Sequence, residues 1–140
     1  MGSTGQSVNS SRASVLVVGA TLKASIPVLA SSGASVVPCP DEKRALKMLG
    51  ERRYQAVVFD MDHSETQRMQ FLRRVCEGFP DVAVVVVTEP GSLRRGMLAM
   101  ISGASAYMLK PLQRENASAG LVRALRKKRL ESAMLKLSNV

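Results

Sequence analysis

The chain has 140 residues, a hydrophobic content of 46%, an aromatic content of only 4% and a formal net charge of +9 at pH 7. This length supports one ordinary domain and is too short for two. No apolar run approaches the roughly 20 residues of a membrane span, and residues 1–12 lack the apolar stretch of a signal peptide. We therefore expect a soluble, cytoplasmic domain behind a flexible tail at residues 1–12.

Residue types that bind transition metals are sparse. Cys39 and Cys76 stand alone, without the spacing of zinc ligands, and His63 is the only histidine. A zinc site is therefore not expected. Both cysteines are interpreted as reduced, partly buried thiols, as in a cytoplasmic protein.

Apolar runs and helical patterns alternate along the chain. In order, the sequence predicts a strand at 15–18, a helix at 21–32, a strand at 35–37, a helix from 41 to about 50, a strand at 54–60, a helix from about 64 to 78, a strand at 82–88, a helix at 92–102, a strand at 106–109 and a helix from about 116 to 137. Units of this length suit right-handed crossovers between parallel strands. The predicted fold class is therefore α/β, a doubly wound five-stranded parallel sheet in a flavodoxin-like (βα)5 three-layer sandwich.

Several residues are expected to start, bend or stop these elements. Thr21 can cap the first helix, Pro27 must delay or bend it, and Pro38 ends the second strand. Asp41 is placed to cap the next helix. In the helix at 92–102, four apolar residues share one side: Leu93, Met97, Leu98 and Ile101.

The last helix continues past the point where the fifth strand and helix complete the domain. Apolar residues keep a rough helical spacing from Val122 to Leu137. Residues 13–130 are predicted to form the domain. The extension at residues 131–140 has three open interpretations: a frayed edge helix, a dimer seam, or a linker to a downstream domain.

Basic side chains crowd the same helix: Arg123, Arg126, Lys127, Lys128, Arg129 and Lys136. A solvated helix face is the favoured interpretation, because no aromatic side chains alternate with these cations to stack on bases. Nucleic-acid binding is the alternative.

Three predicted strands each end at a polar side chain. Asp60, Thr88 and Lys110 directly follow the apolar runs of the third, fourth and fifth strands. Parallel strands bring their carboxyl ends to one edge of the sheet, where ligand crevices lie. An acid, a hydroxyl and an ammonium group at one edge indicate chemistry on an anion.

With these residues placed, the chain resembles the receiver domains of two-component response regulators over most of residues 13–130. The resemblance rests on Val57–Asp60, on Val84–Thr88 and, most specifically, on Gly103–Pro111. A lone strand-terminal Asp is weak evidence, but Asp, Thr and Lys-Pro at these separations together form a fairly strong signature.

The resemblance implies a role for each matching residue. Asp60 would accept a phosphoryl group from a histidine kinase, Thr88 would bond a phosphoryl oxygen, and Lys110 would pair with the carboxylate. Tyr107 stands at the family's switch position. The metal ligands would be Asp60 and the backbone carbonyl of Asp62.

The chain departs from the family pattern on several sides of the pocket. Family members end the first strand with a pair of acidic residues that hold Mg²⁺, and here Gly19 and Ala20 stand at those positions. At the pocket mouth, Glu89 either repels phosphate, neutralises the site lysine or replaces a metal ligand. His63 and Ser64 replace the usual Met-Pro, and His63 is interpreted as an exposed loop residue.

The sequence therefore predicts a signalling module rather than an enzyme: a receiver with a degenerate acidic pocket and impaired Mg²⁺-dependent phosphorylation. It would act through protein contacts on the face of the fourth helix, fifth strand and fifth helix. The expected partners are a histidine kinase or other signalling protein, a downstream output domain, and a second copy of the chain through that face or the extended last helix. Mg²⁺ is expected only if the receiver is phosphorylation-competent.

Other functions stay open. In one, Asp60 is phosphorylated and regulates a DNA-binding output domain, with Asp62 or Glu89 supplying the missing carboxylate. In another, the basic last helix binds nucleic acid. A flavodoxin-like enzyme or nucleotide binder is disfavoured, because Gly19–Leu22 lacks the glycine spacing of a phosphate-binding loop.

Overall fold

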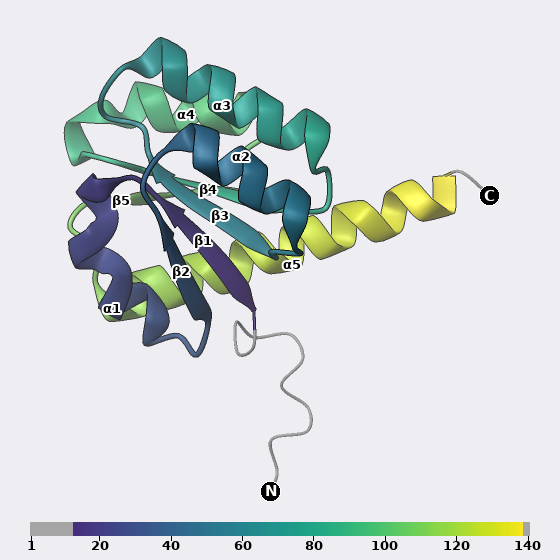
Figure 1. The fold of residues 1–140 in the computed structure, drawn as a ribbon, viewed down its shortest axis with the longest axis horizontal. Coiled ribbons are helices and arrows are strands. Elements are labelled where there is room, and N and C mark those ends of the chain that lie inside the picture. The colour runs from purple at the N-terminus through teal and green to yellow at the C-terminus, as the bar shows by residue number, and fades with distance from the viewer. Residues whose placement is uncertain (1–12, 139–140) are drawn as a thin grey trace, which may run out of the picture.

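The computed structural model describes residues 13–138, and its architecture is the predicted α/β fold (Figure 1). The strands are β1 (Ser14–Val18), β2 (Ser35–Cys39), β3 (Ala56–Asp60), β4 (Ala83–Thr88) and β5 (Ala106–Leu109). Two 3-10 segments, η2 (Ala20–Ser25) and η3 (Pro90–Ser92), accompany the helices α1 (Ile26–Ala30), α2 (Glu42–Glu51), α3 (Glu65–Gly78), α4 (Leu93–Ile101) and α5 (Arg114–Ser138). The tail expected at residues 1–12 lies outside the described residues.

All five strands are parallel and lie in the order β2-β1-β3-β4-β5. The central strands β3 and β4 are apolar up to their last residues and buried along their whole length, as strands covered by helices on both faces must be. In the pairing of β3 with β4, Asp60 lies beside Val87, and in the pairing of β4 with β5, Thr88 lies beside Leu109. The polar ends of these strands therefore lie at one edge of the sheet.

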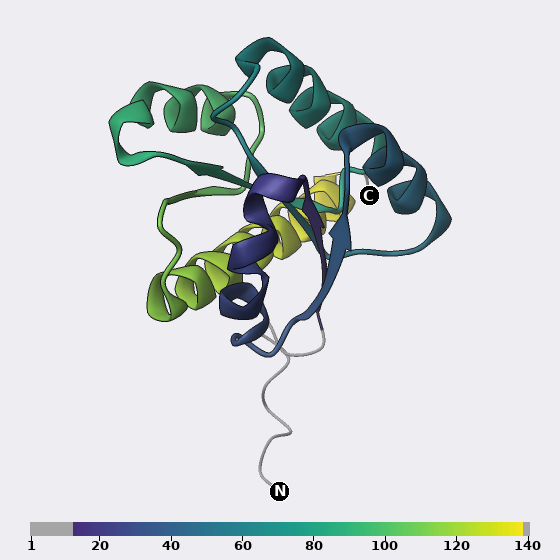
Figure 2. The ribbon, with the colours of Figure 1, turned by 60° about the vertical axis from the view of Figure 1, so that its left-hand side comes forward.

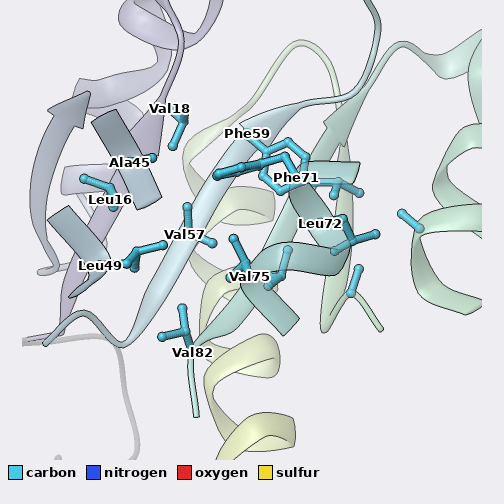
Figure 3. Packing of buried hydrophobic residues seen from close by; sticks show 14 of the residues in the cluster. Leu16, Val18, Ala45, Leu49, Val57, Phe59, Phe71, Leu72, Val75 and Val82 are labelled. Carbon is cyan, nitrogen blue, oxygen red and sulfur yellow. The ribbon is translucent and has the colours of Figure 1, made fainter. Parts of the chain in front are cut away.

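Helices cover both faces of the sheet: α2, α3 and α4 lie on one side, and α1 and α5 lie on the other (Figure 1, Figure 2). In the first layer, Phe59 of β3 and Phe71 of α3 pack edge to face, with ring centroids 4.9 Å apart and planes at 83°. Figure 3 shows these rings together with aliphatic neighbours such as Val57, Leu72 and Val75. The core is otherwise mostly aliphatic, as the composition predicts.

The helix expected at residues 21–32 begins late, as Pro27 was expected to require, and its first residues are not α-helical. Residues 20–25 form the 3-10 segment η2, and α1 begins only at Ile26. Pro27 then lies in the first turn of α1, where its missing N–H costs no helical hydrogen bond. Thr21 caps no helix, because its side chain hydrogen-bonds to Asp60 instead.

The second strand continues past its predicted end, through Pro38 to Cys39. Because β2 is an edge strand, it tolerates a residue without a backbone N–H. Asp41 caps α2 as predicted, and its carboxylate accepts a hydrogen bond from the backbone N–H of Arg44 at 2.8 Å. Cys39 is buried and Cys76 is partly buried, and both are free thiols.

Helix α4 turns its small residues toward the sheet. Gly96 and Ala99 are its buried residues, and the ring of Tyr107 lies so close to Gly96 that a Cβ there would meet it at 2.9 Å. Three of the four apolar residues on the predicted side are therefore 53%, 54% and 80% exposed: Leu93, Met97 and Ile101. We call these three the α4 row. Of the predicted side, only Leu98 packs partly against the core.

Helix α5 buries only its first half. Its buried residues end at Leu125, and four large apolar side chains beyond it are mostly exposed: Leu130, Met134, Leu135 and Leu137. Figure 1 shows this part, in yellow, extending past the sheet. The helix is continuous across residue 130, so the division expected there stays a prediction. Among residues 13–138, no helix combines the length and apolarity needed to cross a membrane.

Two helical glycines give a matched test of the α4 packing. Gly50 in α2 has open space where a Cβ would lie, so Gly50→Ala should stabilise the fold by up to about 1 kcal/mol through helix propensity. Gly96→Ala gains the same propensity but drives a methyl group into the ring of Tyr107, so we expect a net loss of about 1 kcal/mol or more. Urea unfolding followed by circular dichroism measures both. Equal stabilisation by both changes would contradict the close approach of α4 to β5.

Candidate functional site

The three polar strand ends lie together at the carboxyl edge of the sheet. Asp60 closes β3 and is 6% exposed, and Thr88 closes β4 and is fully buried. Lys110 directly follows β5, and its backbone N–H donates to the carbonyl of Thr88 at 2.9 Å. Because β3 and β4 are buried and paired in register, the sheet itself positions these residues.

The ammonium group of Lys110 bridges two carboxylates. Its Nζ lies 2.7 Å from Oδ2 of Asp60 and 2.8 Å from Oδ2 of Asp62. The backbone N–H of Asp62 also donates to Oδ1 of Asp60 at 2.8 Å, which holds the two acidic residues in place relative to each other. Two carboxylates this close repel each other when buried, and the shared cation offsets that repulsion.

Asp62 contributes its side chain to the site. The sequence predicted a metal-binding backbone carbonyl for it and, in one alternative, a carboxylate that replaces a missing acid, but not an ion pair with Lys110. Its Oδ1 lies 3.3 Å from an Nη of Arg95 in α4 and accepts a hydrogen bond from the backbone N–H of Glu89 at 3.2 Å. One buried carboxylate thus contacts α4 and the residues after β4 and β5. The only sequence signal was a second Asp close behind Asp60, and nothing in the sequence pairs it with a cation of α4.

The bridge shifts the pKa values of both its partners. Burial alone would raise the pKa of Asp60, but hydrogen bonds from Lys110, from the backbone N–H of Asp62 and from Thr21 outweigh it, and the pKa lies below its ordinary value of 3.8. Burial acts to lower the pKa of Lys110, but the hydrogen bond to Asp60 and the nearby carboxylate of Asp62 raise it above its ordinary value of 10.5. Asp60 and Lys110 are therefore both charged at neutral pH.

Thr88 and Tyr107 take different positions around this bridge. Within residues 13–138, the buried Oγ1 of Thr88 has no hydrogen-bond partner, an uncommon state for a buried hydroxyl. The Tyr107 ring is partly buried and packs against Gly96 on the inner side of α4. Thr88 thus offers an unused hydrogen-bonding group at the site, while Tyr107 lies between α4 and the core.

A hollow of about 780 Å³ opens between the end of β1 and helices α2 and α3. The residues around it include Gly19, Ala20, Thr21, Asp60, Arg68 and Arg74. Gly19 has φ 99° and ψ 149°, a conformation that residues other than glycine rarely adopt. A carboxylate at this position would therefore require the backbone to move.

Glu89 and His63 lie at the surface of the site, with exposed side chains. Within the described part of the chain, the ion pairs of Lys110 are with Asp60 and Asp62 and none is with Glu89. Neutralisation of Lys110, one of the roles considered for Glu89, thus falls to Asp62. Among residues 13–138, no three or more His, Cys, Asp or Glu side chains are grouped to hold a metal ion.

A profile of the response regulator receiver domain matches residues 19–122. The chain belongs to the response regulator receiver family. The transcriptional regulatory protein ZraR of Escherichia coli O157:H7 is 28% identical over 93 residues, which are 66% of this chain and 21% of that protein. The regulatory protein LuxO of Vibrio cholerae is 29% identical over 83 residues, or 59% of this chain and 18% of that protein. This receiver thus spans about a fifth of the length of these relatives.

Solved structures of receivers share the fold. A response regulator receiver domain from Clostridium thermocellum superposes with a TM-score of 0.72 at 28% identity, covering 84% of this chain and 98% of that one. NtrX from Brucella abortus gives a TM-score of 0.78 at 21% identity over 90% of this chain and 29% of that one, a likeness of fold alone. The predicted receiver family and the predicted doubly wound fold are confirmed.

The charged bridge should make the stability of this receiver depend on pH. Because the pKa of Asp60 is lower in the folded than in the unfolded state, Asp60 contributes stability that is present above pH 3.8 and lost as the pH falls through the folded pKa. We expect the free energy of unfolding to fall as the pH drops below 3.8, and Asp60→Asn to make this fall smaller. Urea titrations at a series of pH values measure it, with exposed Glu77→Gln as control. An unchanged acid slope in Asp60→Asn would contradict the assignment.

Proposed function

We propose that this chain is a receiver module with impaired Mg²⁺-dependent phosphorylation, which signals through protein contacts and has no catalytic turnover of its own. The observation that carries the proposal is the distribution of charge around Asp60. The ammonium group of Lys110 is shared by Asp60 and Asp62, while the end of β1 supplies Gly19 and Ala20 in place of two carboxylates.

The donor set around Asp60 does not suit Mg²⁺. This ion requires near-octahedral oxygen ligands, usually with one or two carboxylates beside the phosphate oxygens. A carboxylate at position 19 is opposed by the backbone conformation of Gly19, and the oxygens of Asp62 already face Lys110 and Arg95. These contacts disfavour the alternative in which Asp62 replaces the missing acid.

The contact surface that we propose lies on α4, β5 and α5. It contains the α4 row and Leu109 of β5, which is 46% exposed, and large exposed apolar groups of this kind mark interaction surfaces. The second half of α5 adds further exposed apolar side chains, from Leu130 to Leu137. The proposed partners are a histidine kinase or other signalling protein, a second copy of the chain, or an output domain, in the cytoplasm.

Mass spectrometry of the intact protein tests the impaired phosphorylation. After incubation with acetyl phosphate and excess Mg²⁺, we expect the mass to stay unchanged, because the site lacks metal ligands and Asp62 competes for Lys110. Ala20→Asp returns one carboxylate to the hollow and should raise the modified fraction. Asp60→Asn combined with Ala20→Asp is the control that removes the acceptor.

Stoichiometric phosphorylation of Asp60 in the unaltered chain would overturn this proposal. It would instead support the competent receiver, whose unused Thr88 hydroxyl would then bind a phosphoryl oxygen.

A further inference from the structure

The carboxylate of Asp62 lies among donors from three separate parts of the fold. Lys110 follows β5, Arg95 belongs to α4, and the backbone N–H of Glu89 follows β4; these donors lie 2.8, 3.3 and 3.2 Å from its oxygens. The Asp62 side chain is only 2% exposed. Lysine, arginine and backbone N–H groups are also the donors with which proteins hold phosphate groups.

We propose that the Asp62 carboxylate occupies the place of a phosphoryl group in this receiver and holds α4 against the sheet without phosphorylation. This inference rests on the proposed function, because it names the group that replaces phosphorylation at the same site. Asp62 is a positioning residue, since it acts on α4 through Arg95.

The position of Asp62 also opposes phosphorylation of its neighbour. A phosphoryl group carries about −1.5 to −2 charges at neutral pH, and on Asp60 it would lie next to a second buried carboxylate. It would also compete with Asp62 for Lys110, whose Nζ is within 2.8 Å of both acidic side chains. Repulsion between like charges is strong where water is excluded. One side chain therefore replaces the phosphoryl group and disfavours its addition.

Arg95 connects this buried anion with the exposed surface of α4. Besides Asp62, its guanidinium group contacts Ser92 Oγ at 3.2 Å and Glu65 Oε1 of α3 at 3.4 Å. The adjacent Arg94 pairs with the same Glu65 at 3.1 Å, but its side chain is 73% exposed. Because α4 carries the α4 row, the anion at position 62 fixes the placement of an exposed apolar surface.

Hydrogen exchange of α4, followed by mass spectrometry, tests the connection. Asp62→Asn keeps the shape of the side chain but removes its charge, and Arg95→Gln removes the cation. Each should accelerate exchange of the α4 amides about tenfold, because a hydrogen bond between charged groups is lost. Arg94→Gln, at the exposed neighbouring pair, should change it less than twofold. Equal exchange in Asp62→Asn and the unaltered protein would overturn the inference.

Rescue by inorganic phosphate distinguishes an anion's role from a merely structural one. In Asp62→Ala, Lys110 and Arg95 each lose one of their anionic partners, and the Thr88 hydroxyl still has no partner, so added phosphate should bind there and restore slow exchange of α4. It should have no such effect in Asp62→Ala combined with Arg95→Gln, or in the unaltered protein. Failure of phosphate to restore slow exchange in Asp62→Ala would also overturn the inference.

The two proposals fail in different experiments. Phosphorylation of the unaltered chain at Asp60 contradicts the impaired receiver. Exchange of α4 that ignores Asp62, or that phosphate cannot restore, contradicts the role of Asp62 and leaves impaired phosphorylation standing. Thermal unfolding of each variant at neutral pH establishes that the variant is folded under the conditions of the exchange experiment.

Discussion

One ammonium group between two buried carboxylates holds the functional edge of this receiver together. Without Lys110, Asp60 and Asp62 would face each other with only backbone donors, Thr21 and the more distant Arg95 to offset their charges. Breaking such a buried arrangement by removing one partner typically costs about 3 kcal/mol or more. The segment after β5 is thereby tied to the end of β3, through the lysine that in the proposed function would bind a phosphoryl group.

Small residues decide how the rest of the chain approaches this edge. Gly19, directly after β1, has a positive φ that disfavours any residue with a side chain. The absence of an acidic residue at this position therefore matches the backbone conformation. Gly96 lets the ring of Tyr107 lie against α4, which leaves the α4 row on the outside. Glycines therefore shape both the hollow beside Asp60 and the exposed surface of α4.

The sequence was most informative where burial alone dictates structure. The apolar runs that end at Asp60, Thr88 and Lys110 predicted the strands and their common edge, because continuous burial leaves parallel strands little choice. It was less informative where tertiary contacts compete with local propensity. Thr21 was predicted to cap a helix, but its side chain hydrogen-bonds to Asp60. Arg95 of α4 pairs with Asp62, which is 33 residues away in the sequence.

The orientation of α4 could not be predicted for a related reason. A helical pattern shows that Leu93, Met97 and Ile101 share a side, but it does not show which side faces the sheet. Here α4 lies so close to Tyr107 of β5 that only small residues, Gly96 and Ala99, fit on the side that faces the sheet. A glycine and an alanine on the opposite side of an apolar row were the only sequence signs of this arrangement.

The most direct test of the account is a crystal structure grown at neutral pH in excess Mg²⁺. We predict that the Lys110 ammonium group lies between the two carboxylates, within hydrogen-bonding distance of both Asp60 and Asp62, with Arg95 on the far oxygen of Asp62. A Mg²⁺ ion coordinated by Asp60, with Lys110 displaced from the carboxylates or Asp62 turned out of the site, would contradict it.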